Sequence, residues 1–294
     1  MTTMRDMIAD TRRMAYGSMT EQINLIAVSA SAGATAITMD MDVSGITPGM
    51  VLSCDLNVWY VRSTIPAQKI VNVIPGYDNS PLKPVAAGDF VILKPRVTDW
   101  FMFETMNQEI LRLSTPEHGL YQLKTWTAAV DPTYQTYDFP AEANDMISML
   151  RVRYLLPGTP DVWIDLPPFA YKTQIDGVMN RIRLLRQVPG GSTMEFMYKS
   201  PFDQASNLED NVNEVCGLSA TMVDIPTLGC LGTLLRTTES RRNQVQTQGD
   251  ARRAGEVSPT SNLRIAQLIE KDHQMRIWEE YARLTSRNPL YKGM

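Results

Sequence analysis

The sequence predicts an α+β fold: a helical bundle with an inserted small β-barrel or sandwich domain, a second β-rich domain and a long C-terminal helix. Apolar residues recur at helical spacing in four separate segments, whereas two long regions between them alternate with a period of two and carry turn signals. The chain of 294 residues also exceeds what one compact core usually uses. We expect five segments, with bounds 1–19, 20–96, 97–120, 121–205 and 206–294.

Segment 1–19 predicts one amphipathic helix, because its apolar residues fall on one face while Arg5, Asp6 and Asp10 surround them. The expected buried face consists of Met4, Met7, Ile8, Thr11, Met14 and Ala15.

Segment 20–96 predicts a small β domain. Short alternating runs, "ATAITMDM", "NVWYVRS", "KIVNVI" and "DFVILK", are separated by Pro-Gly turns at 48–49 and 75–76. Such closely spaced strands are typical of a barrel or a sandwich.

Segment 97–120 returns to helical spacing, with Thr98 as the expected N-cap. The β domain is therefore expected to be an insertion between two helices that can pack on each other. The second helix should bury the stripe Trp100, Phe103, Met106, Ile110 and Leu111.

Segment 121–205 predicts the second β-rich domain, with "ISMLRVRYLL" as one strand. The runs "NRIRLLRQV" and "STMEFMYKS" flank Pro189, Gly190 and Gly191, a combination that predicts a β-hairpin.

Segment 206–294 predicts two helices joined by a charged loop. Asp224 suits a helix cap and Pro226 suits the first turn. The buried face of that helix should hold Leu228, Leu231 and Leu235, and the loop should cover 239–257. The last helix is expected from about 262 to 287, where Asn288 and Pro289 end it.

The last helix carries apolar residues in two directions. Ile265, Leu268 and Ile269 share one face, whereas Ile277, Trp278, Tyr281 and Leu284 lie roughly 100° to 220° around the axis from Ile265. Three interpretations remain open: a helix wedged between its own two subdomains, a helix whose end reaches another chain, or a break near His273.

Composition limits the class of protein. The formal charge of −4 is too small for a whole-surface nucleic-acid binder, and no apolar run reaches the roughly 18 residues of a membrane span. The first residues lack the apolar block of a signal peptide, so we expect a soluble protein made in a cytoplasm, with no membrane partner. The three cysteines, Cys54, Cys216 and Cys230, are expected to be reduced, buried thiols.

No residue pattern predicts catalysis, a cofactor or a metal. Of the two histidines, His118 is expected in a loop and His273 in mid-helix among charges, each solvated or structural. Asp40 and Asp42 resemble the start of a calcium loop, but Val51 stands where the closing glutamate belongs. The carboxylate pairs Glu279–Glu280 and Glu209–Asp210 are expected on helix and loop surfaces.

The stretch "ESRRNQVQTQGDARRAGEV" carries two arginine pairs, Arg241–Arg242 and Arg252–Arg253. Guanidinium groups suit phosphates and carboxylates equally well, and no aromatic residue accompanies them for stacking on bases. A solvated charged loop, a protein contact and a phosphate contact all remain open.

Four passages make the chain similar to the head-to-tail adaptor proteins of tailed bacteriophages. They are "SASAGATAITMDMDVSGITPGMVLSCDLNVWYV", "IPGYDNSPLKPVAAGDFVILKPRVTDWFMFETMNQEI", "GLSATMVDIPTLGCLGTLL" and "SRRNQVQTQGDARRAGEV". The resemblance covers about residues 3 to 289. Where the family usually reads Arg-Gly-Tyr and His-Ala-Ala-Gly, this chain has Pro75-Gly76-Tyr77 and Val85-Ala86-Ala87-Gly88.

The resemblance implies a non-enzymatic virion protein at the head-tail interface, assembled in the host cytoplasm as a ring, typically of twelve copies. Its implied partners are the portal protein, tail or neck proteins below the ring, further copies of itself and, without specificity, the DNA that passes through the channel. The implied interface residues are Arg241, Arg242, Arg252, Arg253, Trp278, Tyr281, Leu284 and Tyr291.

Other functions remain open. Another neck protein or a tail-tube-terminating protein would share the β-rich build. A tail component that binds a host surface would need an exposed aromatic cluster, for which Trp59, Tyr60 and Trp163 are the candidates. A cell-wall hydrolase carried in the tail is the enzymatic alternative.

Overall fold

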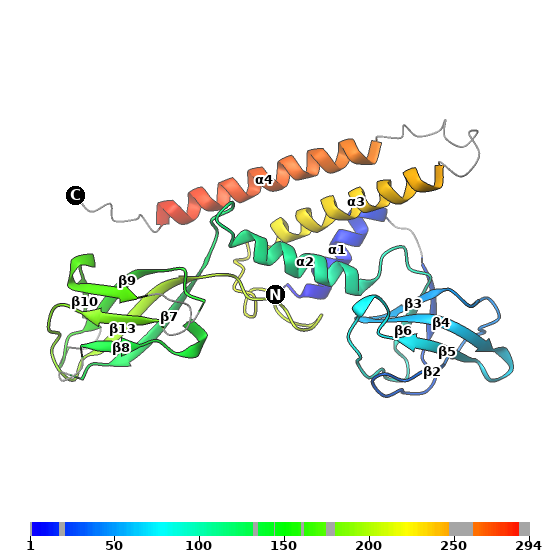
Figure 1. Cartoon of the computed structure of the whole chain (residues 1–294), viewed down its shortest axis with the longest axis horizontal. Coiled ribbons are helices and arrows are strands. Elements are labelled where there is room, and N and C mark those ends of the chain that lie inside the picture. The colour runs from blue at the N-terminus through cyan, green and yellow to red at the C-terminus, as the bar shows by residue number, and fades with distance from the viewer. Residues whose placement is uncertain are drawn as a thin grey trace. The chain divides into compact units, whose positions relative to one another are not determined.

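The computed structural model confirms the α+β fold: the residues that it describes form several antiparallel sheets and four helices, of which the last is the long C-terminal one (Figure 1). It describes residues 2–17, 21–131, 135–143, 145–159, 162–174, 180–246 and 261–287. The chain forms two compact units, each built from two stretches of sequence. The first unit takes residues 1–109 and 204–275, and the second takes 110–203 and 276–294.

The first unit begins with helix α1 (Met4–Tyr16), which starts at a capping box. The Thr3 hydroxyl accepts a hydrogen bond from the Asp6 N–H, and the Asp6 carboxylate accepts one from the Thr3 N–H. The bonds that the Thr3 N–H and hydroxyl donate to the Asp6 carboxylate hold its pKa below the usual value. The predicted face is buried at Met4, Met7, Ile8 and Thr11. Met14 was expected there too, but it is 52% exposed because it lies on the last turn of the helix.

The β part of the first unit is one six-stranded antiparallel sheet curled into a half-barrel, in the order β1-β6-β3-β4-β5-β2. The Ile26–Met39 bridge brings the chain after β1 beside the chain after β2. Alternate residues of the strands point inward onto a core that includes Leu52, Val61 and Val91. The strands are β1 (Gln22–Leu25), β2 (Ala36–Thr38), β3 (Val51–Cys54), β4 (Asn57–Ile65), β5 (Ile70–Pro75) and β6 (Phe90–Leu93), with 3-10 turns at Pro66–Gln68 and Tyr77–Asn79.

Helix α2 (Asp99–Leu113) follows the half-barrel, and Thr98 caps it as predicted, because its hydroxyl accepts a hydrogen bond from the Phe101 N–H. An ion pair of 2.6 Å between Arg12 and Asp99 ties α1 to its start. Phe103, Met106 and Ile110 of the predicted stripe are buried. Leu111, at the edge of that stripe, is 42% exposed.

Helix α3 (Asp224–Gln246) packs on α1, and its Leu231 is buried as predicted, together with Leu234. Helix α4 (Ser261–Arg287) begins in the same unit, where Glu270 pairs with Arg236 of α3. A Cβ built on Gly229 of α3 would lie only 2.7 Å from a carboxylate oxygen of buried Glu109 on α2. This glycine therefore lets the two helices approach at a point where no larger residue fits.

The second unit contains two antiparallel sheets. One has the order β10-β9-β13-β7 and the other the order β11-β12-β8. The strands are β7 (Gln122–Ala129), β8 (Thr136–Asp138), β9 (Ser148–Leu155), β10 (Trp163–Leu166), β11 (Tyr171–Gln174), β12 (Arg181–Leu184) and β13 (Thr193–Ser200), with 3-10 turns at Ala141–Ala143 and Pro168–Ala170.

The predicted hairpin around Pro189, Gly190 and Gly191 is wrong. Strand β12 pairs with β11 and β8, whereas β13 pairs with β7 and β9, so the turn joins two different sheets. The Val130 N–H donates to the Ser192 carbonyl at 2.8 Å, which ties the end of the turn to the end of β7. The turn residues fix where the chain reverses, but they do not fix which strand it reverses onto.

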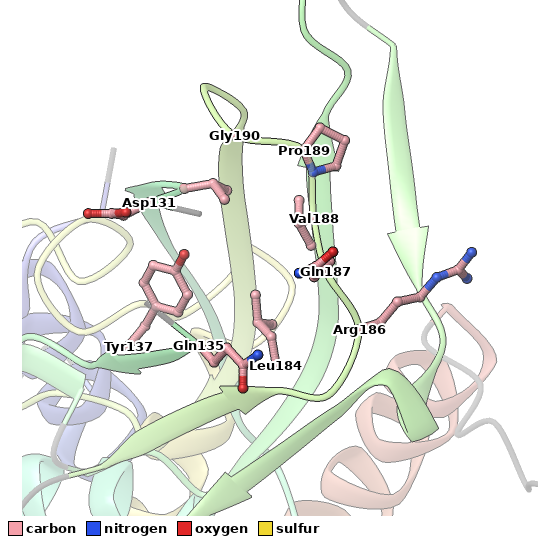
Figure 2. Close-up of a pocket in the computed structure, with 10 residues that line it drawn as sticks. Asp131, Gln135, Tyr137, Leu184, Arg186, Gln187, Val188, Pro189 and Gly190 are labelled. Carbon is pink, nitrogen blue, oxygen red and sulfur yellow. The ribbon is translucent and has the colours of Figure 1, made fainter. Parts of the chain in front are cut away.

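A cavity of about 410 Å³ opens beside this turn (Figure 2). Val130, Leu184 and Val188 give it an apolar wall, and Tyr137 and Asp131 line it as well. Burial raises the pKa of the Tyr137 phenol. Figure 2 shows the Arg186 side chain on the opposite side of the cavity from Asp131, directed away from it.

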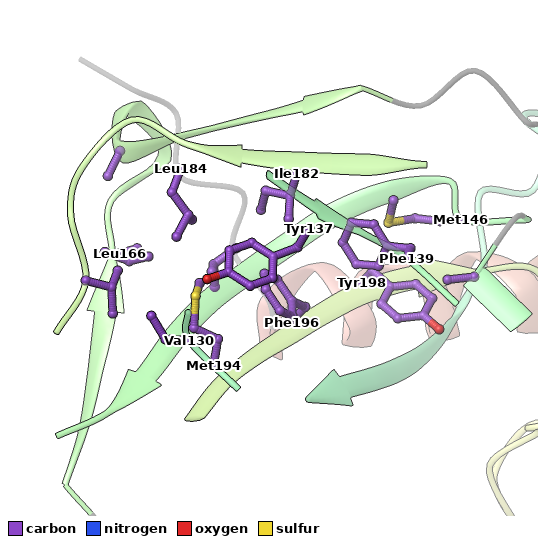
Figure 3. Close-up of a cluster of buried hydrophobic side chains, with 14 residues drawn as sticks. Val130, Tyr137, Phe139, Met146, Leu166, Ile182, Leu184, Met194, Phe196 and Tyr198 are labelled. Carbon is purple, nitrogen blue, oxygen red and sulfur yellow. The ribbon is translucent and has the colours of Figure 1, made fainter. Parts of the chain in front are cut away.

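Aromatic side chains dominate the core of the second unit (Figure 3). Phe196 of β13 is fully buried and packs against both Trp126 and Phe139, with ring centroids 4.8 and 5.5 Å away; those two rings also contact each other at 5.0 Å. Ile182 and Leu184 reach the same core from β12. Since each buried aromatic ring removes a large apolar area from water, this cluster holds the two sheets together.

Candidate interaction surface

Helix α4 buries one continuous stripe. Ala266, His273, Ile277 and Glu280 are each 7% exposed or less, and their spacing of seven, four and three residues places them on one face. The helix runs without interruption from Ser261 to Arg287, so the break considered near His273 is absent. The two apolar directions of the sequence do not match the faces of the folded helix, because Ile277 lies on the buried stripe whereas Trp278 beside it is 74% exposed.

The exposed row lies on the other side of α4. Leu268 is 64% exposed, Met275 52% and Trp278 74%, and they follow one another at intervals of seven and three residues. Lys271 and Ala282 occupy the remaining positions of the same spacing. This alternation of three and four residues is typical of a helix that packs along another element. We call Leu268, Lys271, Met275, Trp278 and Ala282 the outer seam of α4.

The predicted residues at the end of α4 divide between these two faces. Trp278 lies on the outer seam, whereas Leu284 is half-buried. Tyr281 is 42% exposed, and its ring lies over the turn after α2, where a Cβ on Gly119 would be 3.2 Å from the Tyr281 Cε2 atom. Tyr281 therefore has a contact within its own unit, which sequence spacing alone did not indicate.

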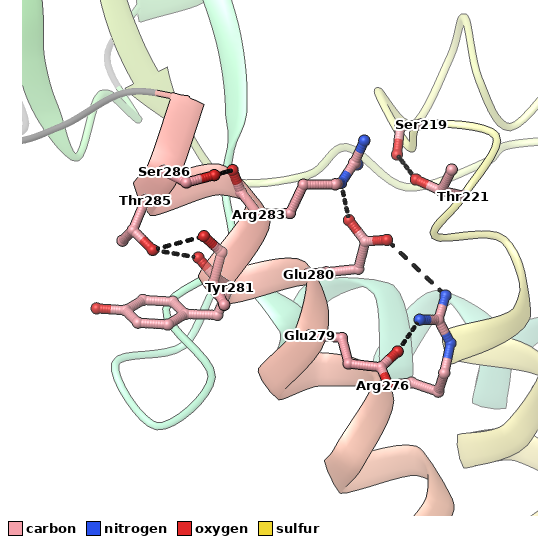
Figure 4. Close-up of polar contacts among 10 residues, drawn as sticks. Ser219, Thr221, Arg276, Glu279, Glu280, Tyr281, Arg283, Thr285 and Ser286 are labelled. Carbon is pink, nitrogen blue, oxygen red and sulfur yellow. Dashed lines mark hydrogen bonds and ion pairs between the residues drawn. The ribbon is translucent and has the colours of Figure 1, made fainter.

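The carboxylate of Glu280 lies between two arginines of its own helix (Figure 4). Arg283 donates to it at 2.6 Å and Arg276 lies 3.8 Å away, while Arg276 also pairs with Glu279. The Glu280 side chain is only 4% exposed, so its expected surface position is wrong. Two cations at i−4 and i+3 offset the cost of burying this charge.

The stretch of paired arginines was expected to be a loop from 239 to 257, but α3 continues to Gln246. Arg241 and Arg242 therefore lie on the helix. Glutamine, arginine and glutamate are good helix formers, and Gly249 is the first residue in the stretch that disfavours a helix. Arg252, Arg253 and Tyr291 lie outside the described residues.

Trp278 is the one residue of the outer seam that is also among the predicted interface residues. Sequence spacing places Leu268 on the face of Ile265 and Ile269, and it assigns no role to Lys271, Met275 or Ala282. The signal that identifies them is the spacing of Leu268, Met275 and Trp278, which fits one straight seam once the helix is known to be continuous.

The described ranges contain no group of three or more His, Cys, Asp or Glu side chains placed to hold a metal ion. Within the same ranges, no helix combines the length and the apolarity needed to cross a bilayer. Cys54, Cys216 and Cys230 are buried, as predicted.

No protein-family model matches the chain, and no curated protein matches it either. Among solved structures, the chain is similar to a protein chain in the neck of an empty GTA particle computed with C6 symmetry. The two share 11% sequence identity at a TM-score of 0.24, over 58% of this chain and 77% of the other. The neighbour is thus a component of a phage-like neck, and the likeness is too distant to decide the function of this chain.

Proposed function

We propose that this chain is a structural, non-enzymatic neck protein of a phage particle, a head-to-tail adaptor that forms a ring and joins the portal vertex to the tail. The ring holds about twelve copies in this proposal, a number taken from the resembled family, and DNA passes through it. The four sequence passages that resemble head-to-tail adaptors support the proposal.

The outer seam of α4 is the observation that carries the proposal. A chain that worked alone would leave Leu268, Met275 and Trp278 in water, whereas exposed apolar rows of this kind are typical of protein interfaces. Tryptophan and methionine are enriched in interface cores. We therefore assign Trp278 to contact with the portal or a neighbouring copy.

Each of the remaining predicted interface residues is assigned a specific contact in this proposal. Arg241 and Arg242, on α3, are proposed to pair with carboxylates of a neighbour. Arg252, Arg253 and Tyr291 are proposed for the same contact on their sequence alone. Tyr281 and Leu284 are proposed to support Trp278 from the same end of α4.

The first test is the mass of the purified chain by light scattering, alone and mixed with the portal ring of the same phage. We expect the chain of 33.1 kDa to join the portal ring in equal copy number. Replacing Met275 and Trp278 with alanine should weaken this binding at least tenfold, because two exposed apolar contacts are lost.

The matched control replaces Leu123 and Ile147 with alanine, since these side chains of the second unit are 42% and 47% exposed and lie outside the outer seam. The control should bind the portal as the unmodified chain does. Equal portal binding by the seam variant and the unmodified chain would refute the role of the seam. Binding to tail tubes instead of the portal would favour the tail-tube-terminating alternative.

A further inference from the structure

The exposed face of the β11–β12 hairpin in the second unit carries a concentration of positive charge. Lys172 stands directly opposite Arg183 in the antiparallel register, and both side chains are exposed. Like charges directly opposite on one face of a sheet destabilise the pairing. Nearby Arg181 is offset by Asp138 at 2.6 Å, but among the described residues no carboxylate pairs with Lys172, Arg183 or Arg186.

Large apolar side chains border these cations. Phe169, on the turn Pro168–Ala170, is 78% exposed, the highest value of any large apolar side chain in the described part of the chain. Leu185 is 60% exposed, and its N–H donates to the Ala170 carbonyl at 2.8 Å, which joins it to the same turn. We call Phe169, Lys172, Arg183, Leu185 and Arg186 the hairpin face.

The combination favours a protein partner over nucleic acid. Phosphate groups would satisfy the cations but would leave Phe169 and Leu185 without an apolar contact. An acidic protein surface with an apolar socket would satisfy both parts, as charge complementarity and buried aromatic anchors do in protein interfaces.

The first unit of a second copy carries a net negative charge that complements the hairpin face. The sequence of the first unit holds 15 Lys and Arg against 20 Asp and Glu, whereas that of the second unit holds 13 against 12. A contact between the hairpin faces of two copies would bring their cations together, so the complementary surface must be a different one. Contacts between two different surfaces of identical chains close into rings when the rotation permits.

We propose that the hairpin face binds the acidic first unit of an adjacent copy and so forms the contact between neighbouring copies. This inference rests on the proposed ring function and names the surface that joins its members. The repulsion between Lys172 and Arg183 within one copy is then offset only when a carboxylate of the neighbour lies between them.

The decisive variant is Lys172→Glu, because it should stabilise the isolated chain and weaken the association between copies. It places a carboxylate opposite Arg183, so the isolated chain should unfold at a higher temperature than the unmodified one. The same change should weaken association between copies about tenfold or more, since a carboxylate would then face an acidic surface. Lys172→Arg, which keeps the positive charge opposite Arg183, is the matched control and should leave association unchanged.

The measurement is the number of copies bound per portal ring, and the association of the chain alone, by light scattering. Carbodiimide coupling of a mixture of ¹⁵N-labelled and unlabelled chains identifies the contact directly. We expect mixed-isotope peptides that join Lys172 to an Asp or Glu within 1–109 or 204–275.

Three outcomes would overturn the inference. Unchanged association of the Lys172→Glu chain, with normal portal binding, refutes the hairpin face and leaves the proposed function standing. A chain that neither self-associates nor joins the portal refutes both. Salt-sensitive binding of a DNA duplex, measured by fluorescence anisotropy and lost in Lys172→Glu while copy number is unchanged, assigns the face to nucleic acid instead.

Discussion

Two glycines of α3 illustrate how a single residue fixes the approach of two helices. Gly229 faces the buried Glu109 carboxylate of α2 at 2.7 Å from an added Cβ, whereas Gly232 has its nearest neighbour, Ile269, at 3.9 Å. The two positions belong to the same helix and differ mainly in the space around them. Alanine substitutions at the two positions therefore separate the effect of helix propensity on stability from the effect of packing.

We predict that Gly229→Ala destabilises the chain by about 1–3 kcal/mol, because the new methyl group overlaps the Glu109 side chain. Gly232→Ala should instead be neutral or stabilise by up to about 1 kcal/mol, since alanine has the higher helix propensity and ordinary contact distance is available. Denaturant unfolding of both variants measures the difference. Equal stability of the two would contradict the close contact at Gly229.

Two buried thiols make the free energy of unfolding depend on pH at alkaline values. Burial raises the pKa of Cys54 and of Cys230 to about 12 each, from a reference value of 9.0. The folded chain therefore keeps these protons in a range where the unfolded chain loses them, so the free energy of unfolding falls as pH rises above 9.

We predict that a chain with Cys54→Ala and Cys230→Ala loses less stability between pH 8 and pH 10 than the unmodified chain, by about 3 kcal/mol for the two thiols together. Urea unfolding at both pH values gives the comparison, in which the double variant serves as its own reference at pH 8. An identical loss in both proteins would show that the two thiols do not titrate on unfolding.

At the scale of single elements, periodicity predicted the helices well. The buried face of α1, the cap at Thr98 and the extent of α4 all follow from local spacing and caps. The prediction that failed concerns pairing between segments that lie far apart in the sequence. The turn at Pro189 joins two sheets because pairing partners come from β7 and β11, and no local signal specifies them.

Charged residues show the same limit. Glu280 was expected at the surface because carboxylates usually lie there, yet its side chain is 4% exposed between Arg276 and Arg283. The spacing of one acid between two bases was visible in the sequence, but only the direction of the buried stripe reveals that the acid points inward.

We predict that Glu280→Gln destabilises the chain by about 1–3 kcal/mol, because two arginines lose a buried carboxylate that offsets their charge. Glu279→Gln is the matched control: the side chain is 57% exposed, so its removal should change stability by less than about 1 kcal/mol. Thermal unfolding of both variants decides between them. A larger effect at Glu279 than at Glu280 would contradict this account.

At the scale of the whole molecule, the proposed ring uses two surfaces with different physics. The outer seam of α4 is mainly apolar, whereas the hairpin face is cationic around two apolar side chains. Added salt screens charges but not apolar contacts. The two variants proposed above, at Trp278 and at Lys172, should therefore differ in how their effects depend on ionic strength.

The first unit combines residues 1–109 with residues 204–275, and this affects the order in which parts of the chain can fold during synthesis. The Thr3–Asn211 bridge and the hydrogen bond from the Arg5 N–H to the Leu208 carbonyl join segments about two hundred residues apart. Residues 110–203 of the second unit leave the ribosome before two later partners of α1, the chain near Leu208 and helix α3, exist. The aromatic core around Phe196 can thus form before α1 makes its contacts with the chain near Leu208, because that part of the chain is translated later.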